Sequence, residues 1–212
     1  MFYDFPPTQY LFEHFDLVWP RIVEHLTISG LSVAIALLIS LPVGLLLSRI
    51  GSLATPALVV LSLVYTIPSM AFFAFLVPFT GIGTRPAVIA LSAYALFVLV
   101  RNTVVAFKGV DPTIIEAARG MGMSPGQLLW RIEVPLAMPV IVAGVRIATL
   151  ATIGLTAIAA WIGAGGLGQE LRDGMNDPTG SRLYSAVICV AAMAIGADVI
   201  FRFVMRRVEV GR

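Results

Sequence analysis

The side chains best suited to chemistry are few in this 212-residue chain and form no recognisable catalytic set. His14 and His25 both precede the first long apolar run, where we interpret them as residues of a polar lead-in segment, and Cys189 stands alone. The only lysine, Lys108, is followed by Gly109, so the sequence has no Gly-Lys-Ser/Thr phosphate loop. We therefore predict no catalytic residues, no metal site and no cofactor bound by this chain.

One polar stretch has the residue spacing of a docking helix. Its members, in order, are Glu116, Ala117, Ala118, Arg119, Gly122, Ile132, Glu133, Val134 and Pro135. The two alanines allow a partner to approach closely, Gly122 permits a sharp turn, and Glu116 and Arg119 offer polar anchors. The pattern predicts a helix that binds a partner protein. An ordinary amphipathic helix on the membrane surface is the alternative.

The composition assigns the chain to a membrane. It is 58% hydrophobic and 12% charged, with a mean hydropathy of +0.94, whereas soluble domains are about 25% charged. So little charge cannot cover a water-exposed surface of this size. The composition excludes intrinsic disorder, nucleic-acid binding and a disulfide-stapled secreted module.

Long uncharged stretches predict an all-α integral membrane fold, because a helix needs about 20 apolar residues to cross a bilayer. We expect five spans, at about 25–48, 53–79, 86–107, 136–163 and 183–204. Residues 1–24 would form an extracytoplasmic N-terminal segment. Pro68 should break or kink the second span, and Pro86 should open the third.

Residues 108–135 carry several charges and are predicted to lie in solvent between spans three and four. Asp111-Pro112 and Ser124-Pro125 each combine a capping residue with a proline at the first helical position. Gln127 completes a capping box with Ser124. We expect Gly120 and Gly122 to end the first short helix and Pro135 to end the second.

The distribution of Lys and Arg predicts the orientation. If residues 108–135 are cytoplasmic, that side has ten positive residues and the other has four. The ten are Arg49, Arg101, Lys108, Arg119, Arg131, Arg146, Arg202, Arg206, Arg207 and Arg212, against Arg21, Arg85, Arg172 and Arg182. The N-terminus is therefore expected outside and the C-terminus in the cytoplasm.

The stretch from Glu116 to Pro135 closely resembles the EAA signature of permease subunits of bacterial ABC importers, with Val134 where the family has Leu. The stretch from Arg101-Asn102-Thr103 to the string Trp161-Ile162-Gly163-Ala164-Gly165-Gly166-Leu167-Gly168 looks like permeases that import glycine betaine, choline or carnitine. The methionine importer permease shares the same features and is the alternative.

The resemblance implies a set of partners. In that family the EAA segment is a coupling helix that docks on a separate ATPase, which uses ATP and Mg. An extracytoplasmic substrate-binding protein delivers the substrate, and two permeases, identical or similar, pack about a two-fold axis in the bacterial cytoplasmic membrane. The corresponding coupling residues here are Glu116, Ala117, Ala118, Arg119, Gly122 and Pro135.

The glycine string also fits G-x-G-x-x-G, the dinucleotide-binding fingerprint, but we reject that function because the string follows a membrane span and is expected to lead into a loop. We predict instead a gate beside the translocation path, with tight packing at the helix end as the alternative. The residues assigned to the gate or path are Pro68, Trp161, Gly163, Gly165, Gly166 and Gly168.

Arg101, Arg146 and Asp198 are the charges nearest the hydrocarbon, where charged residues are usually functional. Asp198 and Arg202 are one helical turn apart, so we favour a local pair. The alternative is that Asp198 reaches Arg101 or Arg146 on another span. A secondary transporter would need coupling charges deeper in its spans, so we consider that function less well supported.

Overall fold

The computed structural model describes residues 7–210, and every regular element in them is helical. The elements in chain order are α1 (Pro7–Glu13), α2 (Phe15–Arg49), α3 (Gly51–Thr66), α4 (Ser69–Thr80), α5 (Thr84–Lys108), α6 (Pro112–Gly120), α7 (Pro125–Leu128), a π-helix (Leu129–Glu133), α8 (Val134–Ala159), a 3-10 helix (Ala160–Ile162), α9 (Leu167–Gly174) and α10 (Ser181–Val210).

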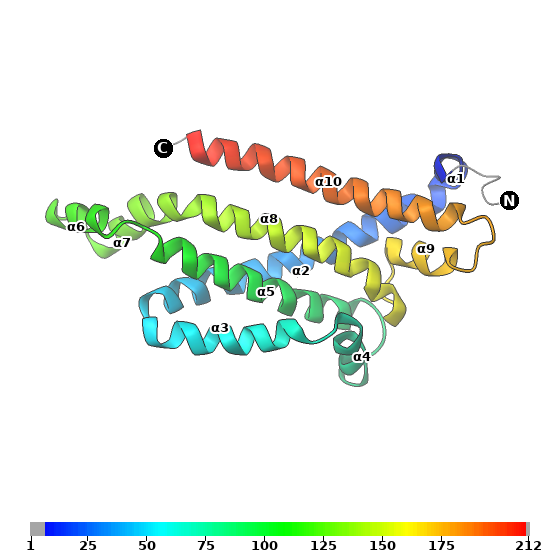
Figure 1. The fold of residues 1–212 in the computed structure, drawn as a ribbon, viewed down its shortest axis with the longest axis horizontal. Coiled ribbons are helices and arrows are strands. Elements are labelled where there is room, and N and C mark those ends of the chain that lie inside the picture. The colour runs from blue at the N-terminus through cyan, green and yellow to red at the C-terminus, as the bar shows by residue number, and fades with distance from the viewer. Residues whose placement is uncertain (1–6, 211–212) are drawn as a thin grey trace.

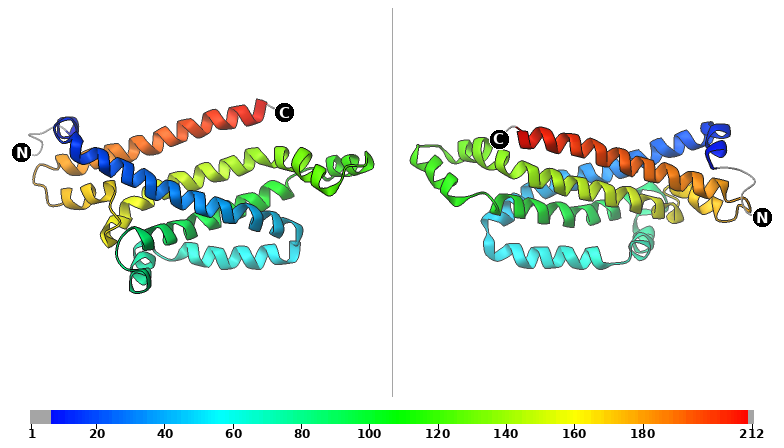
Figure 2. Two further views of the ribbon diagram at one scale, coloured as in Figure 1. Left: turned by 180° about the vertical axis from the view of Figure 1, so that it is seen from behind. Right: turned by 45° about the horizontal axis from the view of Figure 1, so that its top comes forward.

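Four long helices, α2, α5, α8 and α10, run along the longest axis of the molecule (Figure 1). Helix α5 packs against α2 and α8, while α3 packs on α5 and α10 on α8. Helices α3 and α10 occupy opposite edges of the bundle in all three views (Figures 1 and 2). Helix α1 lies at one end of the long axis and α6 at the other, and α10 ends short of α6 (Figures 1 and 2).

Four helical stretches are long and apolar enough to cross a membrane, or five if the bent pair α3 and α4 forms one span. The fold is therefore the all-α membrane fold that the composition predicts. Large apolar side chains remain exposed along these helices, among them Leu38, Ile195 and Phe203. Such surfaces are suited to lipid or to a second membrane subunit.

Helix α2 begins at Phe15, ten residues before the start of the first expected span. Residues 15–24 therefore belong to the same helix as the span and are not a separate N-terminal segment; residues 1–6 lie outside the described chain. Charged side chains near a helix end can reach the aqueous boundary. An uncharged run therefore indicates which part of a helix lies in the hydrocarbon. It does not indicate where the helix begins.

The break expected at Pro68 is present. Helix α3 ends at Thr66, α4 begins at Ser69, and their axes differ by 92°. A broken helix leaves backbone carbonyls without intrahelical partners, and here the Tyr94 hydroxyl donates a 2.6 Å hydrogen bond to the Ile67 carbonyl. An aromatic side chain of α5 thus stabilises the break.

Two expectations about prolines are wrong. Pro86 is the third residue of α5 and not its first. Pro135 ends no helix, because α7, the π-helix and α8 form one continuous helical stretch from Pro125 to Ile162. The Val134 N–H donates to the Leu129 carbonyl in the wider π-turn, and this turn relieves the crowding that a proline ring causes inside a regular helix.

Small residues allow the three central helices to cross closely. A side chain at Gly44 of α2 would collide with Thr103 of α5, and one at Gly144 of α8 would collide with Asn102 of α5. Because Asn102 and Thr103 are adjacent, both crossings lie at the same level of α5. Small residues at such crossings are typical of membrane helix packing.

Candidate functional site

Residues 108–135, called the coupling segment after their predicted role, project beyond the end of the helical bundle (Figures 1 and 2). Helix α6 contacts α7 and the π-helix. Along α6 only Ala118 is buried, whereas Glu116, Ala117 and Arg119 are exposed. Glu116 and Arg119 take part in no ion pair within residues 7–210. Three of the motif residues of α6, Glu116, Ala117 and Arg119, are thus displayed on a free surface.

Both predicted helix starts are confirmed. The Asp111 carboxylate accepts hydrogen bonds from the Thr113 backbone N–H at 2.9 Å and from its hydroxyl at 2.8 Å. The bond from the backbone N–H is the main reason that the pKa of Asp111 lies below its ordinary value of 3.8. The cap is therefore complete at neutral pH and is lost only as the pH falls through that lowered value. Ser124 and Gln127 form the expected capping box.

Gly122 ends α6 through a Schellman motif. Its φ angle is +80°, in the left-handed region that glycine adopts most easily. The Gly122 N–H donates to the Arg119 carbonyl at 2.9 Å, and the Met123 N–H donates to the Ala118 carbonyl at 3.2 Å. The motif glycine is thus the residue that turns the chain from α6 toward α7.

Glu133 belongs to the motif stretch, but its sequence context predicted no role for it. Its side chain is only 2% exposed, and the Arg49 guanidinium at the end of α2 donates to its carboxylate. The apolar neighbours Ile132 and Val134 are a sequence signal for a buried carboxylate. The partner could not be predicted, because 84 positions separate the two residues.

Two of the three charges nearest the hydrocarbon, Arg146 and Asp198, form a cluster with Arg202. Arg146 Nε donates to Asp198 Oδ1 at 2.6 Å, and Arg202 Nε donates to Asp198 Oδ2 at 2.8 Å. Asp198 therefore makes the local pair and also the pair across to α8, two arrangements that the sequence analysis treated as alternatives. Arg101 is exposed and joins no ion pair in the described part of the chain. The cluster ties α10 to α8.

The glycine string from Gly163 to Gly168 forms a turn at the other end of the bundle, and it is buried from Ala164 onward. Gly163, Gly165 and Gly166 have φ angles of +77°, +87° and +70°. The expectation of a following loop is wrong, since the string leads directly into α9. The element before it is a helix and not a strand, so the dinucleotide fingerprint remains excluded.

Contacts around this turn are close. The Gly166 N–H donates to Glu24 Oε2 of α2 at 2.7 Å. A side chain at Gly165 would collide with the Glu24 carboxylate, and one at Gly168 with the Ala157 carbonyl. Trp161 beside the turn is 41% exposed. This packing favours the alternative of a tight helix end, while gating remains a prediction.

His25 is not part of a polar lead-in segment. It lies within α2, its side chain is fully buried, and its Nε2 is 2.9 Å from the Ile153 carbonyl of α8. The residue before it, Glu24, accepts the hydrogen bond from the Gly166 N–H of the glycine turn. Within residues 7–210, no three His, Cys, Asp or Glu side chains lie close enough together to hold a metal ion.

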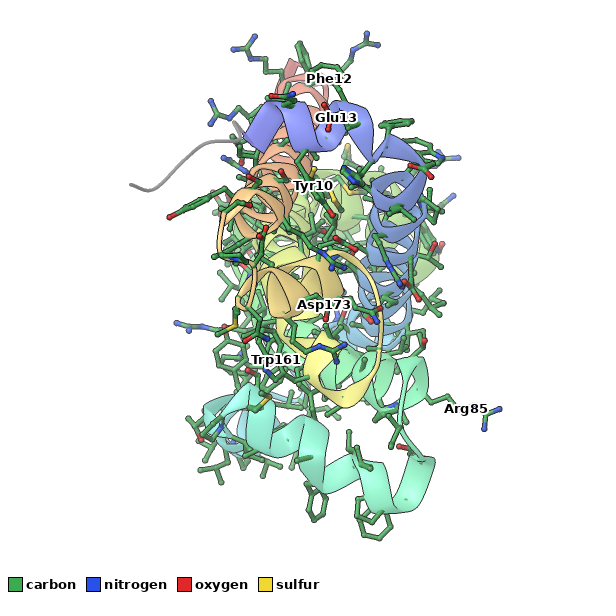
Figure 3. The ribbon with its side chains drawn as sticks, turned by 90° about the vertical axis from the view of Figure 1, so that its right-hand side faces the viewer. Tyr10, Phe12, Glu13, Arg85, Trp161 and Asp173 are labelled. Carbon is green, nitrogen blue, oxygen red and sulfur yellow. The ribbon has the colours of Figure 1, made fainter. Side chains whose placement is uncertain are left out.

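A polar network joins α1, α9 and α10 beside the glycine turn. Arg182 Nε donates to Glu170 Oε2 at 2.7 Å, and Arg182 Nη2 donates to Asp173 Oδ2 at 3.0 Å. The Tyr10 hydroxyl reaches Glu170 at 3.5 Å, and burial raises the pKa of that hydroxyl. Figure 3 views this end of the bundle, with Tyr10, Asp173 and Trp161 labelled.

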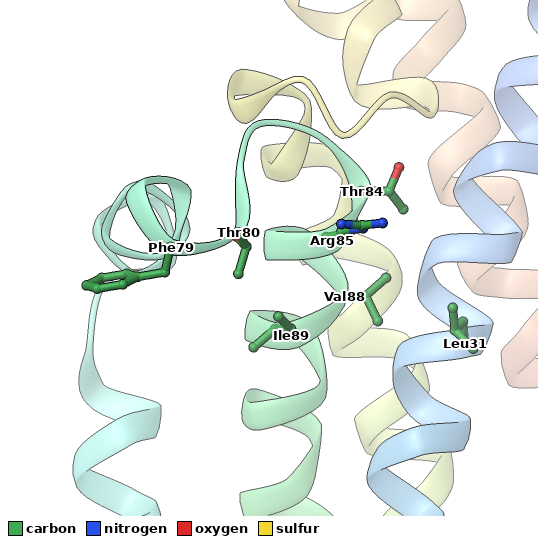
Figure 4. A pocket seen from close by; sticks show the side chains of 7 residues that line it. All are labelled: Leu31, Phe79, Thr80, Thr84, Arg85, Val88 and Ile89. Carbon is green, nitrogen blue, oxygen red and sulfur yellow. The ribbon is translucent and has the colours of Figure 1, made fainter.

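An open groove of about 490 Å³ lies at the same end, between α2, α4 and α5. Its lining is mainly apolar, and Arg85 is the charged residue in it. Figure 4 shows Arg85 on the side facing Leu31 of α2, whereas Phe79 turns to the opposite side. The two side chains therefore do not face each other across a ligand-sized space.

Comparison with protein-family models matches residues 22–210 to the binding-protein-dependent transport system inner membrane component. The carnitine transport permease protein OpuCB of Listeria monocytogenes is 42% identical over 153 residues, covering 72% of this chain and 70% of that protein. The osmoprotectant import permease protein OsmW of Salmonella typhimurium is 41% identical over 180 residues, covering 82% and 84%. The choline transport system permease protein OpuBB of Bacillus subtilis is 34% identical over 184 residues, covering 87% and 85%.

Among solved structures, an inward-facing conformation of the MetNI methionine ABC transporter contains a chain with a similar fold. The TM-score is 0.84 at 23% sequence identity, and the match covers 92% of this chain and 98% of that chain. At this identity the likeness concerns the fold alone.

Proposed function

This chain belongs to the family of binding-protein-dependent transport system inner membrane components, and from that premise we propose that it forms the translocation pathway of an ATP-driven importer of quaternary ammonium osmoprotectants. It is a membrane transport subunit. In this proposal ATP and Mg are used by separate ATPase subunits. The substrate class would be that of glycine betaine, choline and carnitine.

The observation that carries the proposal is the free surface of α6 at the end of the bundle. Glu116, Ala117 and Arg119 are exposed there, and the capped helix ends at Gly122. A short rigid helix with small and charged side chains is suited to a groove on a partner protein. After the turn at Gly122, α7, the π-helix and α8 form one continuous stretch, so a displacement of α6 would reach the membrane-spanning helices.

The relatives support the substrate class. Carnitine, osmoprotectant and choline permeases are 34–42% identical to this chain, whereas the chain of the methionine transporter is 23% identical. An osmoprotectant is therefore better supported than methionine. Glycine betaine, choline and carnitine share a quaternary ammonium group.

The remaining partners follow from the same proposal. An extracytoplasmic binding protein would deliver substrate at the end that carries the glycine turn, and α6 would face the cytoplasm. Because four or five spans are few for an enclosed path, a second identical or similar permease would complete it about a two-fold axis. ATP binding would draw the ATPase subunits together and open the cavity outward, and hydrolysis would reset it.

Reconstitution tests the proposal. The chain is placed in liposomes with its ATPase and binding protein, and uptake of labelled glycine betaine, choline, carnitine and methionine is measured with and without internal ATP. We expect ATP-dependent uptake of one or more quaternary ammonium compounds, with competition among them. Uptake that persists without ATP would contradict the importer, and uptake of methionine alone would contradict the substrate class.

A further inference from the structure

An open groove of about 720 Å³ separates the end of α2 from the coupling segment. The last two turns of α2 line one side, and residues of α6, α7 and the π-helix line the other. Because the groove is hollow, side-chain packing does not fill the space between α2 and the coupling segment. An ion pair crosses the groove at this point.

The ion pair joins Arg49 to Glu133. Arg49 is the last residue of α2 and is 48% exposed, whereas Glu133 is the last residue of the π-helix and is 2% exposed. A carboxylate this deeply buried requires a compensating charge, since an unpaired buried charge is strongly destabilising. Because separating the two charges is costly, Arg49 and Glu133 should stay paired when the elements around them move.

The coupling segment therefore has three routes into the membrane. Two are covalent, from α5 through residues 109–111 and through the π-helix into α8. The third passes through Glu133 to Arg49 and α2, which packs along α5 and α8 and leads through Ile50 into α3. Without the ion pair, movement of the coupling segment would act directly on α5 and α8, and on α2 only through them.

The position of Glu133 on the π-helix is consistent with a role in a conformational change of the coupling segment. A π-turn is a rare helical geometry that often occurs at functional sites. Arg49 is half-exposed, so its side chain can follow the carboxylate without leaving water. In this pair the Glu133 carboxylate is buried and held in place, whereas the Arg49 side chain is half-exposed and free to change its conformation.

We propose that Arg49 and Glu133 are positioning residues that transmit displacement of the coupling segment to α2 during ATP-driven transport. This inference rests on the proposed function. It assigns a role to two residues that lie outside the EAA alanines and glycine. Its consequence is measurable as the number of ATP molecules hydrolysed per substrate imported.

The test uses the complete complex in liposomes, with the labelled quaternary ammonium compound that the wild type imports. Glu133→Gln and Arg49→Gln each remove one charge, Arg49→Lys keeps the charge, and Arg207→Gln is a control at an exposed arginine of the same end. We expect the two neutral variants to raise the ATP-to-substrate ratio about tenfold, within the usual range for a coupling interaction. Arg49→Lys and Arg207→Gln should stay close to the wild type.

A double variant, Arg49→Gln with Glu133→Gln, keeps the test decisive if the single variants assemble poorly, because it leaves no uncompensated charge. It should assemble and show the same raised ratio. A role confined to stability would lower the amount of complex and leave the ratio per assembled complex unchanged, which would overturn the inference. A wild type without ATP-dependent uptake would instead contradict the proposed function itself.

Discussion

Asp198 accepts hydrogen bonds from Arg202 on its own helix and from Arg146 on α8. Sequence spacing predicted the first pair, because residues four apart share a helix face. The second pair depends on how α8 and α10 pack, which spacing does not specify. Removal of the Asp198 carboxylate should destabilise the fold more than removal of either arginine, since it leaves two positive charges facing each other.

Asp198→Asn is expected to destabilise the purified protein. The substitution removes the negative charge between Arg146 and Arg202, so the midpoint of thermal unfolding in detergent and the yield of assembled complex should both fall. Arg202→Gln is the matched control and should have a smaller effect, because Arg146 still reaches Asp198. Wild-type assembly and wild-type uptake in Asp198→Asn would exclude a role for the cluster.

Gly122→Ala is expected to impair coupling. A non-glycine residue in the left-handed region costs about 1–2 kcal/mol, and Gly122 has a φ angle of +80°. Gly126→Ala is the control, because a side chain has open space at both positions and only Gly122 has a positive φ. ATP-driven uptake should fall for Gly122→Ala alone. Equal uptake by both variants would show that the turn geometry is not needed.

The elements of the fold differ in how far the sequence could predict them. The caps at Asp111 and Ser124 and the break at Pro68 were predictable, because a few adjacent residues determine them. Helix α9 and the continuous helix through Pro135 were not, since the packing of Gly168 on α8 and the π-turn decide them.

The candidate site shows the same division. The helical placement of the motif residues of α6 was predictable from the cap at Asp111 and the glycines that follow them, and their coupling role stays a prediction. The ion pair of Glu133 and the deep burial of His25 could not, because their partners Arg49 and Ile153 are 84 and 128 positions away in the sequence.

Gly168→Ala tests the packing of α9 on α8. Its side chain would overlap the Ala157 carbonyl, and overpacking of this kind costs about 1–3 kcal/mol. We expect a lower unfolding midpoint in detergent. Gly154→Ala on α8 is the control, because it has open space and gains about 1 kcal/mol of helix propensity. If Gly168→Ala is as stable as Gly154→Ala, the close approach does not exist.

The two ends of the molecule carry different structural features. One end presents α6, whose exposed residues have the EAA spacing, and the other presents the glycine turn, the polar network of Glu170 and the groove with Arg85. The long apolar helices between them expose large side chains to lipid or to a second subunit. The proposed mechanism requires that force enter at the first end and substrate at the second.

Site-directed cross-linking to the ATPase in the assembled complex tests this account most directly. Ala117→Cys is made in a Cys189→Ser background, with Met175→Cys, which is exposed beyond α9 at the other end, as the control. The account predicts that a short reagent with one thiol-reactive and one amine-reactive group joins Cys at position 117, and not at position 175, to lysine side chains of the ATPase subunit. A complex that imports substrate with ATP but forms no cross-link from position 117, or forms one from position 175, would contradict it.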